Sequence, residues 1–203
     1  MDDACQYGMV HEYCKLKPLT HVQGIAVNSA MTYSFVESEN LPGLTIVAEE
    51  RLDALADILG QCTIVGKTRG SDLAGSQYRS PFAVEARRPV ILSNHVTAES
   101  GTGLVHCAPA HGAEDYHAFL ASDPGSFKSG LLCHVDGEGK FTDDIAEVVG
   151  NSAAKELVGQ DIMKAGSRSV TKLLEAVGAL VKVQRIRHRY PYDWKTGEPV
   201  ITL

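Results

Sequence analysis

The residues Gly101–Tyr116, GTGLVHCAPAHGAEDY, constrain the fold more than any other part of the chain. Glycines on both sides of Thr102 predict a turn, and the apolar run LVHC predicts a short strand that ends near His106. The turn PAHG then leads to Glu114 and Asp115, which we expect in the first turn of a helix, where the helix dipole stabilises ionised carboxylates. An ionised carboxylate at this position suits the binding of an ammonium group or the orientation of a water molecule. Ordinary helix capping is the alternative.

Short strands and helices follow one another irregularly along the rest of the chain. Residues 23–37 predict two strands joined through Asn28 and Ser29, whereas residues 48–61 carry leucine and alanine at helical spacing and predict one helix. Other segments predict two β-rich runs, a hairpin and two further helices: CTIVG, PVILSNHVT, VDGEGKFTDD, NSAAKELVGQDIM and SVTKLLEAVGAL. This order predicts an α+β fold with a barrel-like sheet, and it disfavours a doubly wound parallel sheet.

Composition excludes several classes of protein. The chain has 203 residues, enough for one substantial core, and no apolar run is long enough to span a bilayer, so we expect no membrane contact. The opening MDDACQYGMV does not resemble a secretory signal. The five cysteines are odd in number and form no CxxC pair, which indicates a reducing, mitochondrial or cytoplasmic compartment. A net charge of −6 argues against tight autonomous binding to nucleic acid, although brief contact with one end of an RNA stays open.

Metal binding and cysteine chemistry are two alternatives for the same stretch. The potential zinc ligands match neither HExxH nor H-x-E followed by PCxxC, so we expect no metal. Adjacent strand residues point to opposite faces, so His106 and Cys107 are not expected to meet, and a core cysteine is the simpler interpretation. The potential ligands considered are His106, Cys107, His111, Asp115, Cys133 and His134.

Nucleotide cofactors and nucleic-acid binding are weakly indicated by two other segments. Neither GTG nor KTRGSDLAG has the spacing of a P-loop or a dinucleotide fingerprint, so we expect no cofactor. The tail RIRHRYPYDWKTGEPVI is basic and aromatic, and a solvated edge strand is its default interpretation.

The stretch GTGLVHCAPAHGAEDY resembles the signature of the editing (connective peptide) domain that is inserted in isoleucyl-tRNA synthetases, and valyl-type domains share a looser form of it. Residues about 22–201 carry further blocks of the family in the family's order, and residues 1–21 form a divergent N-terminal segment. The exit YPYDWKT is similar to the organellar and Gram-positive-like branch. The other blocks are GIAVN, GSDLAGSQYRSPF, NHVT, VDGEGKFTDD and YPYDWKTGEPVI.

This resemblance implies a β-barrel core of the valyl/isoleucyl/leucyl type with surrounding helices, at residues 22–203, as a fragment of a larger synthetase. The ATP-binding HIGH and KMSKS signatures of the parent are absent from this sequence. The implied activity is hydrolysis of valyl-tRNA(Ile) with exclusion of isoleucine, without cofactor or metal. The implied partners are the 3′ end of tRNA(Ile) carrying valine and the remainder of the synthetase, including its ATP-binding catalytic domain.

The resemblance also implies roles for individual residues. Asp115 matches the family's essential aspartate, which holds the α-ammonium of the substrate. His106 matches the histidine that lines the amino-acid pocket and helps to exclude isoleucine. Gly101, Thr102 and Gly103 match the backbone turn beside that pocket.

The chain departs from the family before the GIAVN block. The family has a threonine-rich tract there, whose hydroxyls and backbone hold the terminal adenosine and the attacking water, whereas this chain reads HEYCKLKPLTHV and keeps only Thr20. Two interpretations therefore stay open beside the editing hydrolase. One is a catalytically degenerate insertion that binds the aminoacyl end of tRNA or is purely structural, and the other is an unrelated hydrolase that uses Cys107.

Overall fold

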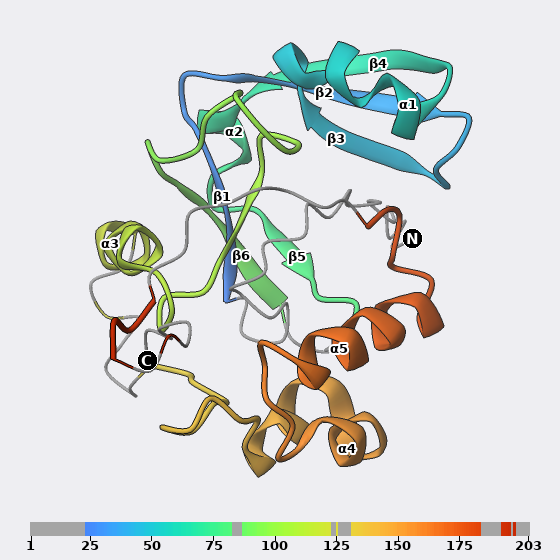
Figure 1. Cartoon of the computed structure of the whole chain (residues 1–203). Coiled ribbons are helices and arrows are strands. Elements are labelled where there is room, and N and C mark those ends of the chain that lie inside the picture. The colour runs from blue at the N-terminus through green and yellow to red at the C-terminus, as the bar shows by residue number, and fades with distance from the viewer. Residues whose placement is uncertain are drawn as a thin grey trace.

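The computed structural model describes residues 23–82, 87–122, 125, 131–183, 192–195 and 197 (Figure 1). Two sheets form the first part of the chain, and a pair of helices forms a separate layer toward its C-terminal part (Figure 1). The strands are β1 (Gly24–Val27), β2 (Thr32–Ser38), β3 (Leu44–Ala48), β4 (Cys62–Arg69), β5 (Gln77–Arg79), β6 (Arg87–Leu92) and β7 (Val105–Cys107). The helices are α1 (Ala56–Leu59), α2 (Gly70–Leu73), α3 (Ala113–Ser122), α4 (Ala146–Leu157) and α5 (Ala165–Ala176).

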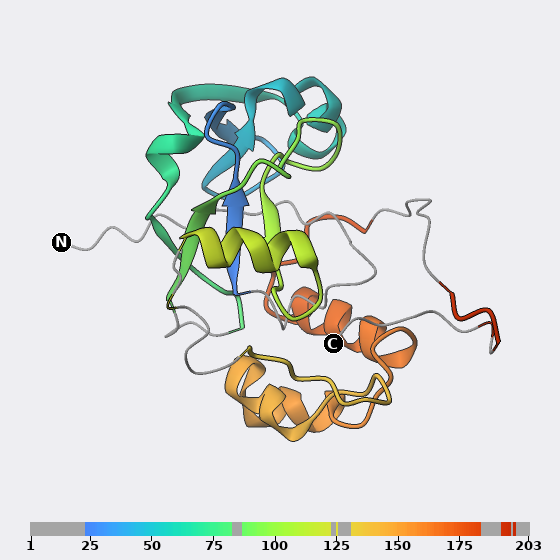
Figure 2. The ribbon, with the colours of Figure 1, turned by 90° about the vertical axis from the view of Figure 1, so that its left-hand side faces the viewer.

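The four-stranded sheet has the order β5-β6-β1-β7 and carries the predicted strand-turn-helix stretch. Its central strand β1 runs parallel to β6 and antiparallel to β7, with Ile25 opposite both Val90 and His106. Helix α3 lies across one face of this sheet, as Figure 2 shows, and Phe119 packs there with Ala26. The strand β1 is buried along its whole length, which explains its purely apolar sequence GIAV.

The three-stranded sheet has the order β3-β2-β4. The predicted pair of strands at residues 23–37 is confirmed as β1 and β2, but these neighbours along the chain enter different sheets. The α+β class is confirmed as well. Because the two sheets share no strand pairing, no closed barrel forms within the described residues, and the expected barrel closure is not found there.

The single helix predicted over residues 48–61 is wrong. Ala48 ends β3, and two short 3-10 turns, Glu49–Arg51 and Asp53–Leu55, precede the four-residue helix α1. The backbone leaves helical geometry at Leu55, where φ is −101° and ψ is 4°. Leu55 and Leu59, four residues apart, still pack together with Val36 and Val47 of the sheet, as helical spacing predicts, although the helix between residues 48 and 61 is interrupted.

A separate apolar cluster holds the C-terminal part together. The predicted hairpin is confirmed, since Val135 pairs with Phe141 and Asp136 donates its N–H to the carbonyl of Lys140 at 2.9 Å. The two predicted helices are α4 and α5, and Leu157 and Leu174 join Phe141 in the cluster. Gly166 of α5 lies so close to Phe141 that an added Cβ would stand 2.7 Å from the ring.

Two sequence predictions concern residues outside the described ranges. The divergent segment at residues 1–21 lies outside them, as does most of the basic and aromatic tail. None of the described helices is long and apolar enough to cross a membrane.

Close approach of α3 to β1 depends on Gly24. A Cβ at this position would lie 2.6 Å from the ring of Phe119 and 3.0 Å from the carbonyl oxygen of Pro89. We therefore expect Gly24→Ala to lower the free energy of unfolding by about 1–3 kcal/mol, because the helix must move away from the sheet. Thermal unfolding, compared with Gly137→Ala at a glycine that has open space around it, measures this. Equal melting temperatures for both variants would contradict the packing.

Candidate active site

The turn Gly101–Gly103 precedes β7 and needs glycine for two reasons. Gly101 and Gly103 have φ values of 65° and 78°, which residues with a Cβ rarely adopt. A Cβ on Gly103 would also lie 2.3 Å from the Cβ of Ala48. The expected backbone turn is therefore present, and it lies directly against the end of β3.

Groups of the three-stranded sheet hold this turn from one side. The Tyr33 hydroxyl donates to the carbonyl of Gly103 at 2.9 Å and accepts from the N–H of Asn28 at 3.0 Å. The N–H of Ala48 donates to the carbonyl of Thr102 at 2.8 Å. Burial raises the pKa of Tyr33, an effect that the hydrogen bond from Asn28 partly offsets, so the hydroxyl keeps its proton and acts as a donor.

Arg51 holds the same loop from the 3-10 turn that follows β3. Its Nε donates to the carbonyl of Gly101 at 2.8 Å, and Nη1 lies 3.3 Å from the carbonyls of both Ala98 and Glu99. A guanidinium can serve several acceptors at once because its donors diverge in one plane. The residue therefore ties three carbonyls of the loop to one side chain.

His106 and Cys107 lie on opposite faces of β7, as predicted. His106 is half-buried opposite Ile25, whereas Cys107 is fully buried among apolar side chains that include Phe119. A thiol in this apolar core fits the core-cysteine interpretation.

Asp115 lies in the first turn of α3, as predicted, but its carboxylate points back toward β7. Its Oδ2 accepts a hydrogen bond from the N–H of Ala108 at 2.9 Å, and the residue is only 1% exposed. The neighbouring Glu114 is exposed. The hydrogen bond to Ala108 joins the helix start to the chain just beyond the end of β7, and Asp115 lies near Cys107, the neighbour of His106 on the other face of that strand.

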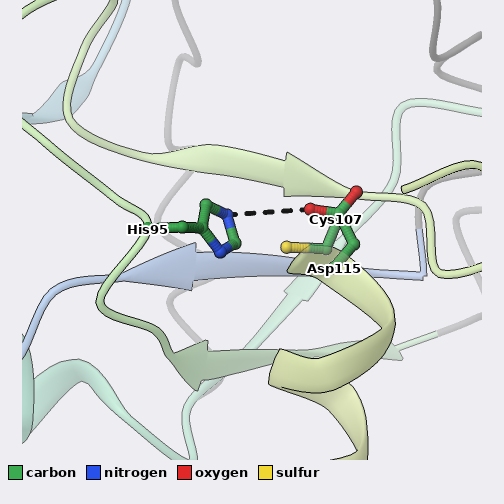
Figure 3. Close-up of side chains that lie close together, drawn as sticks. All are labelled: His95, Cys107 and Asp115. Atoms are coloured by element: carbon green, nitrogen blue, oxygen red, sulfur yellow. Dashed lines mark ion pairs between the residues drawn. The ribbon is translucent and has the colours of Figure 1, made fainter. Parts of the chain in front are cut away.

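His95 lies beside Asp115, and the site prediction did not include it. Its Nε2 lies 3.6 Å from Asp115 Oδ1, and its Nδ1 lies 2.8 Å from the hydroxyl of Ser93. Figure 3 shows the imidazole pointing toward the carboxylate, with the sulfur of Cys107 beside them. The sequence contained one relevant signal, the NHVT block shortly before GTG. His95 and Asp115 are twenty residues apart, however, and that spacing does not reveal their contact.

Three potential metal ligands come together here. One donor atom each of His95, Cys107 and Asp115 lies within 4.8 Å of the other two. Of the six potential ligands weighed from the sequence, this group therefore contains Cys107 and Asp115. A tetrahedral zinc site needs four ligands, and this group supplies three. That no metal binds stays a prediction.

The comparisons with known proteins agree on one family. No family model matches the chain. The isoleucine–tRNA ligase of Acaryochloris marina is 36% identical over 178 residues, which are 87% of this chain and 17% of that protein. The mitochondrial isoleucine–tRNA ligase of Gallus gallus is 36% identical over 170 residues, which are 83% of this chain and 16% of that protein. The chain thus spans about one sixth of the length of these relatives.

Solved structures show the fold. The crystal structure of GlLeuRS-CP1 has a TM-score of 0.62 at 16% identity, and the match covers 85% of this chain and 82% of that chain. A crystal structure of the P. falciparum cytosolic leucyl-tRNA synthetase editing domain has a TM-score of 0.53 at 11% identity, and the match covers 79% of this chain and 75% of that chain. The chain therefore belongs to the isoleucine–tRNA ligase family, and its fold is that of the leucyl-tRNA synthetase CP1 and editing-domain structures.

Proposed function

We propose that the chain hydrolyses the ester of valine mischarged on tRNA(Ile) and spares isoleucyl-tRNA(Ile). One observation carries the proposal: a buried carboxylate, Asp115, is held at the junction of a strand end and a helix start, in a chain 36% identical to isoleucine–tRNA ligases. Valine and isoleucine differ by one methylene, which a single apolar pocket discriminates weakly, so a second pocket that hydrolyses the smaller product adds selectivity.

Hydrolysis of the ester requires of the protein chiefly positioned groups and electrostatic stabilisation. An aminoacyl ester is already activated, so hydrolysis needs a placed water molecule and stabilisation of the developing oxyanion. Asp115 would pair with the substrate α-ammonium, and its burial strengthens that pairing because little water screens it. His106, half-buried at the strand end, would form one wall of the side-chain pocket.

The proposed partners follow from the parent enzyme. They are the 3′ end of tRNA(Ile) carrying valine and the remainder of the ligase, including its ATP-binding domain. We propose a mitochondrial or cytoplasmic location, which the relationship to a mitochondrial isoleucine–tRNA ligase supports. The organellar and Gram-positive-like branch, indicated by YPYDWKT, stays a prediction, as does the division into residues 1–21 and 22–203.

The structural arrangement disfavours the alternative hydrolase that would use Cys107. Both ring nitrogens of His95 already face other groups, Ser93 and Asp115, so the imidazole is not oriented to take a proton from the thiol. A cysteine with no exposed surface is also a poor nucleophile.

A catalytically degenerate insertion is the second candidate, and the missing threonine-rich tract favours it. A deacylation assay separates the two candidates. We expect the chain, and a ligase that contains it, to hydrolyse valyl-tRNA(Ile) and to leave isoleucyl-tRNA(Ile) intact. Absence of valyl-tRNA(Ile) hydrolysis from both would establish the degenerate insertion.

The role of Asp115 predicts a loss that affects both esters. Asp115→Asn keeps the shape of the side chain and removes its charge, so the substrate ammonium loses its partner. We expect hydrolysis to fall on the order of 100-fold, as for the loss of one partner of a buried ion pair worth about 3 kcal/mol. Initial rates of deacylation measure the loss, and Glu114→Gln, at the exposed neighbour, is the matched control. Equal rates in the two variants would remove Asp115 from the mechanism.

The role of His106 predicts a change of selectivity. His106→Ala removes one wall of the proposed pocket, so isoleucyl-tRNA(Ile) should become a substrate while valyl-tRNA(Ile) is still hydrolysed in part. The ratio of the two deacylation rates, with a thermal melt to confirm folding, tests this. A folded variant that still spares isoleucyl-tRNA(Ile) would show that the histidine does not act as the sieve.

The hydrogen bonds from Arg51 predict that activity depends on a fixed conformation of the loop before β7. Arg51→Ala leaves three carbonyls without their donor, so we expect the loop to loosen and valyl-tRNA(Ile) hydrolysis to fall by roughly tenfold, which corresponds to about 1.4 kcal/mol. Arg51→Lys should recover little, because one ammonium cannot span the three acceptors. Lys67→Ala, which removes an exposed pair with Glu49, is the control and should stay near the wild-type rate. Similar rates for Arg51→Ala and the control would contradict the prediction.

A further inference from the structure

We infer that His95 is a positioning residue for the proposed reaction: its imidazole, oriented by Ser93, sets the direction of the Asp115 carboxylate. The inference rests on the proposed function, because it gives Asp115 the task of meeting the substrate ammonium. Nothing in the sequence comparison assigns a role to His95.

The His95 segment is fastened on both sides to the end of β1. Ser93 directly follows β6, and its N–H donates to the carbonyl of Val27 at 2.9 Å. On the other side, the amide of Asn28 donates from Nδ2 to the carbonyl of Val96 at 2.9 Å, and Val96 is fully buried. The backbone on both sides of His95 is therefore held in place, which limits where the imidazole ring can lie.

The hydrogen-bonding pattern decides which ring nitrogen carries the proton. Nε2 faces Asp115 Oδ1, and an unprotonated Nε2 would set two acceptors against each other. A neutral ring therefore carries its proton on Nε2, and its Nδ1 then accepts from the hydroxyl of Ser93, which lies 2.8 Å away. In this tautomer the neutral imidazole donates toward the carboxylate without cancelling its charge, so Asp115 remains able to attract an ammonium group.

The contact has room to tighten. The separation of 3.6 Å between Nε2 and Oδ1 exceeds a hydrogen bond, and Nε2 is buried without a hydrogen-bond partner in the described part of the chain. A movement of about half an ångström would close the bond, and such contacts commonly shorten when substrate binds. The side chain of His95 is 13% exposed, so water competes little for this nitrogen.

Asp115 is thereby approached by donors from two elements that are independent of α3. The N–H of Ala108, just beyond β7, donates to Oδ2. The imidazole of His95, from the segment after β6, faces Oδ1 (Figure 3). A donor placed at the second oxygen restricts the rotation of a carboxylate further. Loss of His95 would keep the charge of Asp115 but let its carboxylate rotate more freely. Substrate binding should therefore be affected less than the alignment of the ester with the attacking water.

The kinetic test uses three substitutions and a control in the full chain. His95→Ala should lower kcat for valyl-tRNA(Ile) by about 10- to 100-fold, the loss that misplacement of reacting groups causes, and change KM by less than about threefold. His95→Gln, whose Nε2 can still donate to Asp115, should recover most of the rate, and Ser93→Ala should show a smaller loss than His95→Ala. Asn94→Ala, at the exposed neighbour, should behave as wild type.

The same variants can also contradict the proposed role of His95. An unchanged kcat in His95→Ala, or an equal loss in His95→Ala and His95→Gln, would overturn the positioning role. A fall in melting temperature without a change in kcat would assign His95 a structural role only. Zinc that binds in a one-to-one ratio to the wild type and not to His95→Gln would show a metal site instead and would also overturn the inference.

A spectroscopic measurement separates failure of this inference from failure of the proposed function. Imidazole nitrogen NMR of the chain, with the His95 signal assigned through His95→Gln, should show the proton on Nε2. That signal should shift in Asp115→Asn and stay unchanged in Glu114→Gln. If the chain lacks deacylase activity but shows these shifts, the proposed function fails and the contact stands. A proton on Nδ1, or no response to Asp115→Asn, overturns the inference whether or not the chain is active.

Discussion

The hydrogen bond from the N–H of Ala108 to the carboxylate of Asp115 is the contact on which the site depends. A carboxyl group with 1% exposure is costly to bury unless hydrogen-bond partners replace the water it has lost. Ala108 supplies one donor, and the helix dipole at the start of α3 favours the negative charge. Because the donor belongs to the chain just beyond β7, the bond that makes the charge tolerable also joins helix and strand at the place where we propose chemistry.

The two sheets cooperate to present this site, although they share no strand pairing in the described residues. The four-stranded sheet carries β7 and the packed face of α3, while Tyr33 and Arg51, from the other sheet and the turn after it, hold the loop that leads into β7. A loop held by side chains from a second layer can keep an irregular path with positive φ at Gly101 and Gly103. Such a path is typical of binding sites placed on loops by a rigid scaffold.

Local sequence patterns predicted the strand at 105–107, the start of α3 and the opposite faces of His106 and Cys107, because each depends on neighbours within a few residues. The helix expected over residues 48–61 failed for the opposite reason. Ala48, the first residue of the expected helix, instead ends β3, where it pairs with Tyr33 of β2, and a pairing between residues so far apart in the sequence leaves no trace in local spacing.

The sequence by itself determined the family, the turn before β7 and the carboxylate at the start of α3, since ordered blocks and short-range propensities carry that information. Only the tertiary structure decided that β1 and β2 enter different sheets and that Asp115 faces inward, toward Ala108 and His95. His95 and Asp115 stand twenty residues apart, and no periodicity of strand or helix relates them. Because β1 runs parallel to β6 and antiparallel to β7, these two strands end at opposite ends of β1, so strand pairing alone does not bring the two residues together. Their contact depends on packing: Val96, next to His95, joins Cys107 and Phe119 of α3 in one buried apolar cluster.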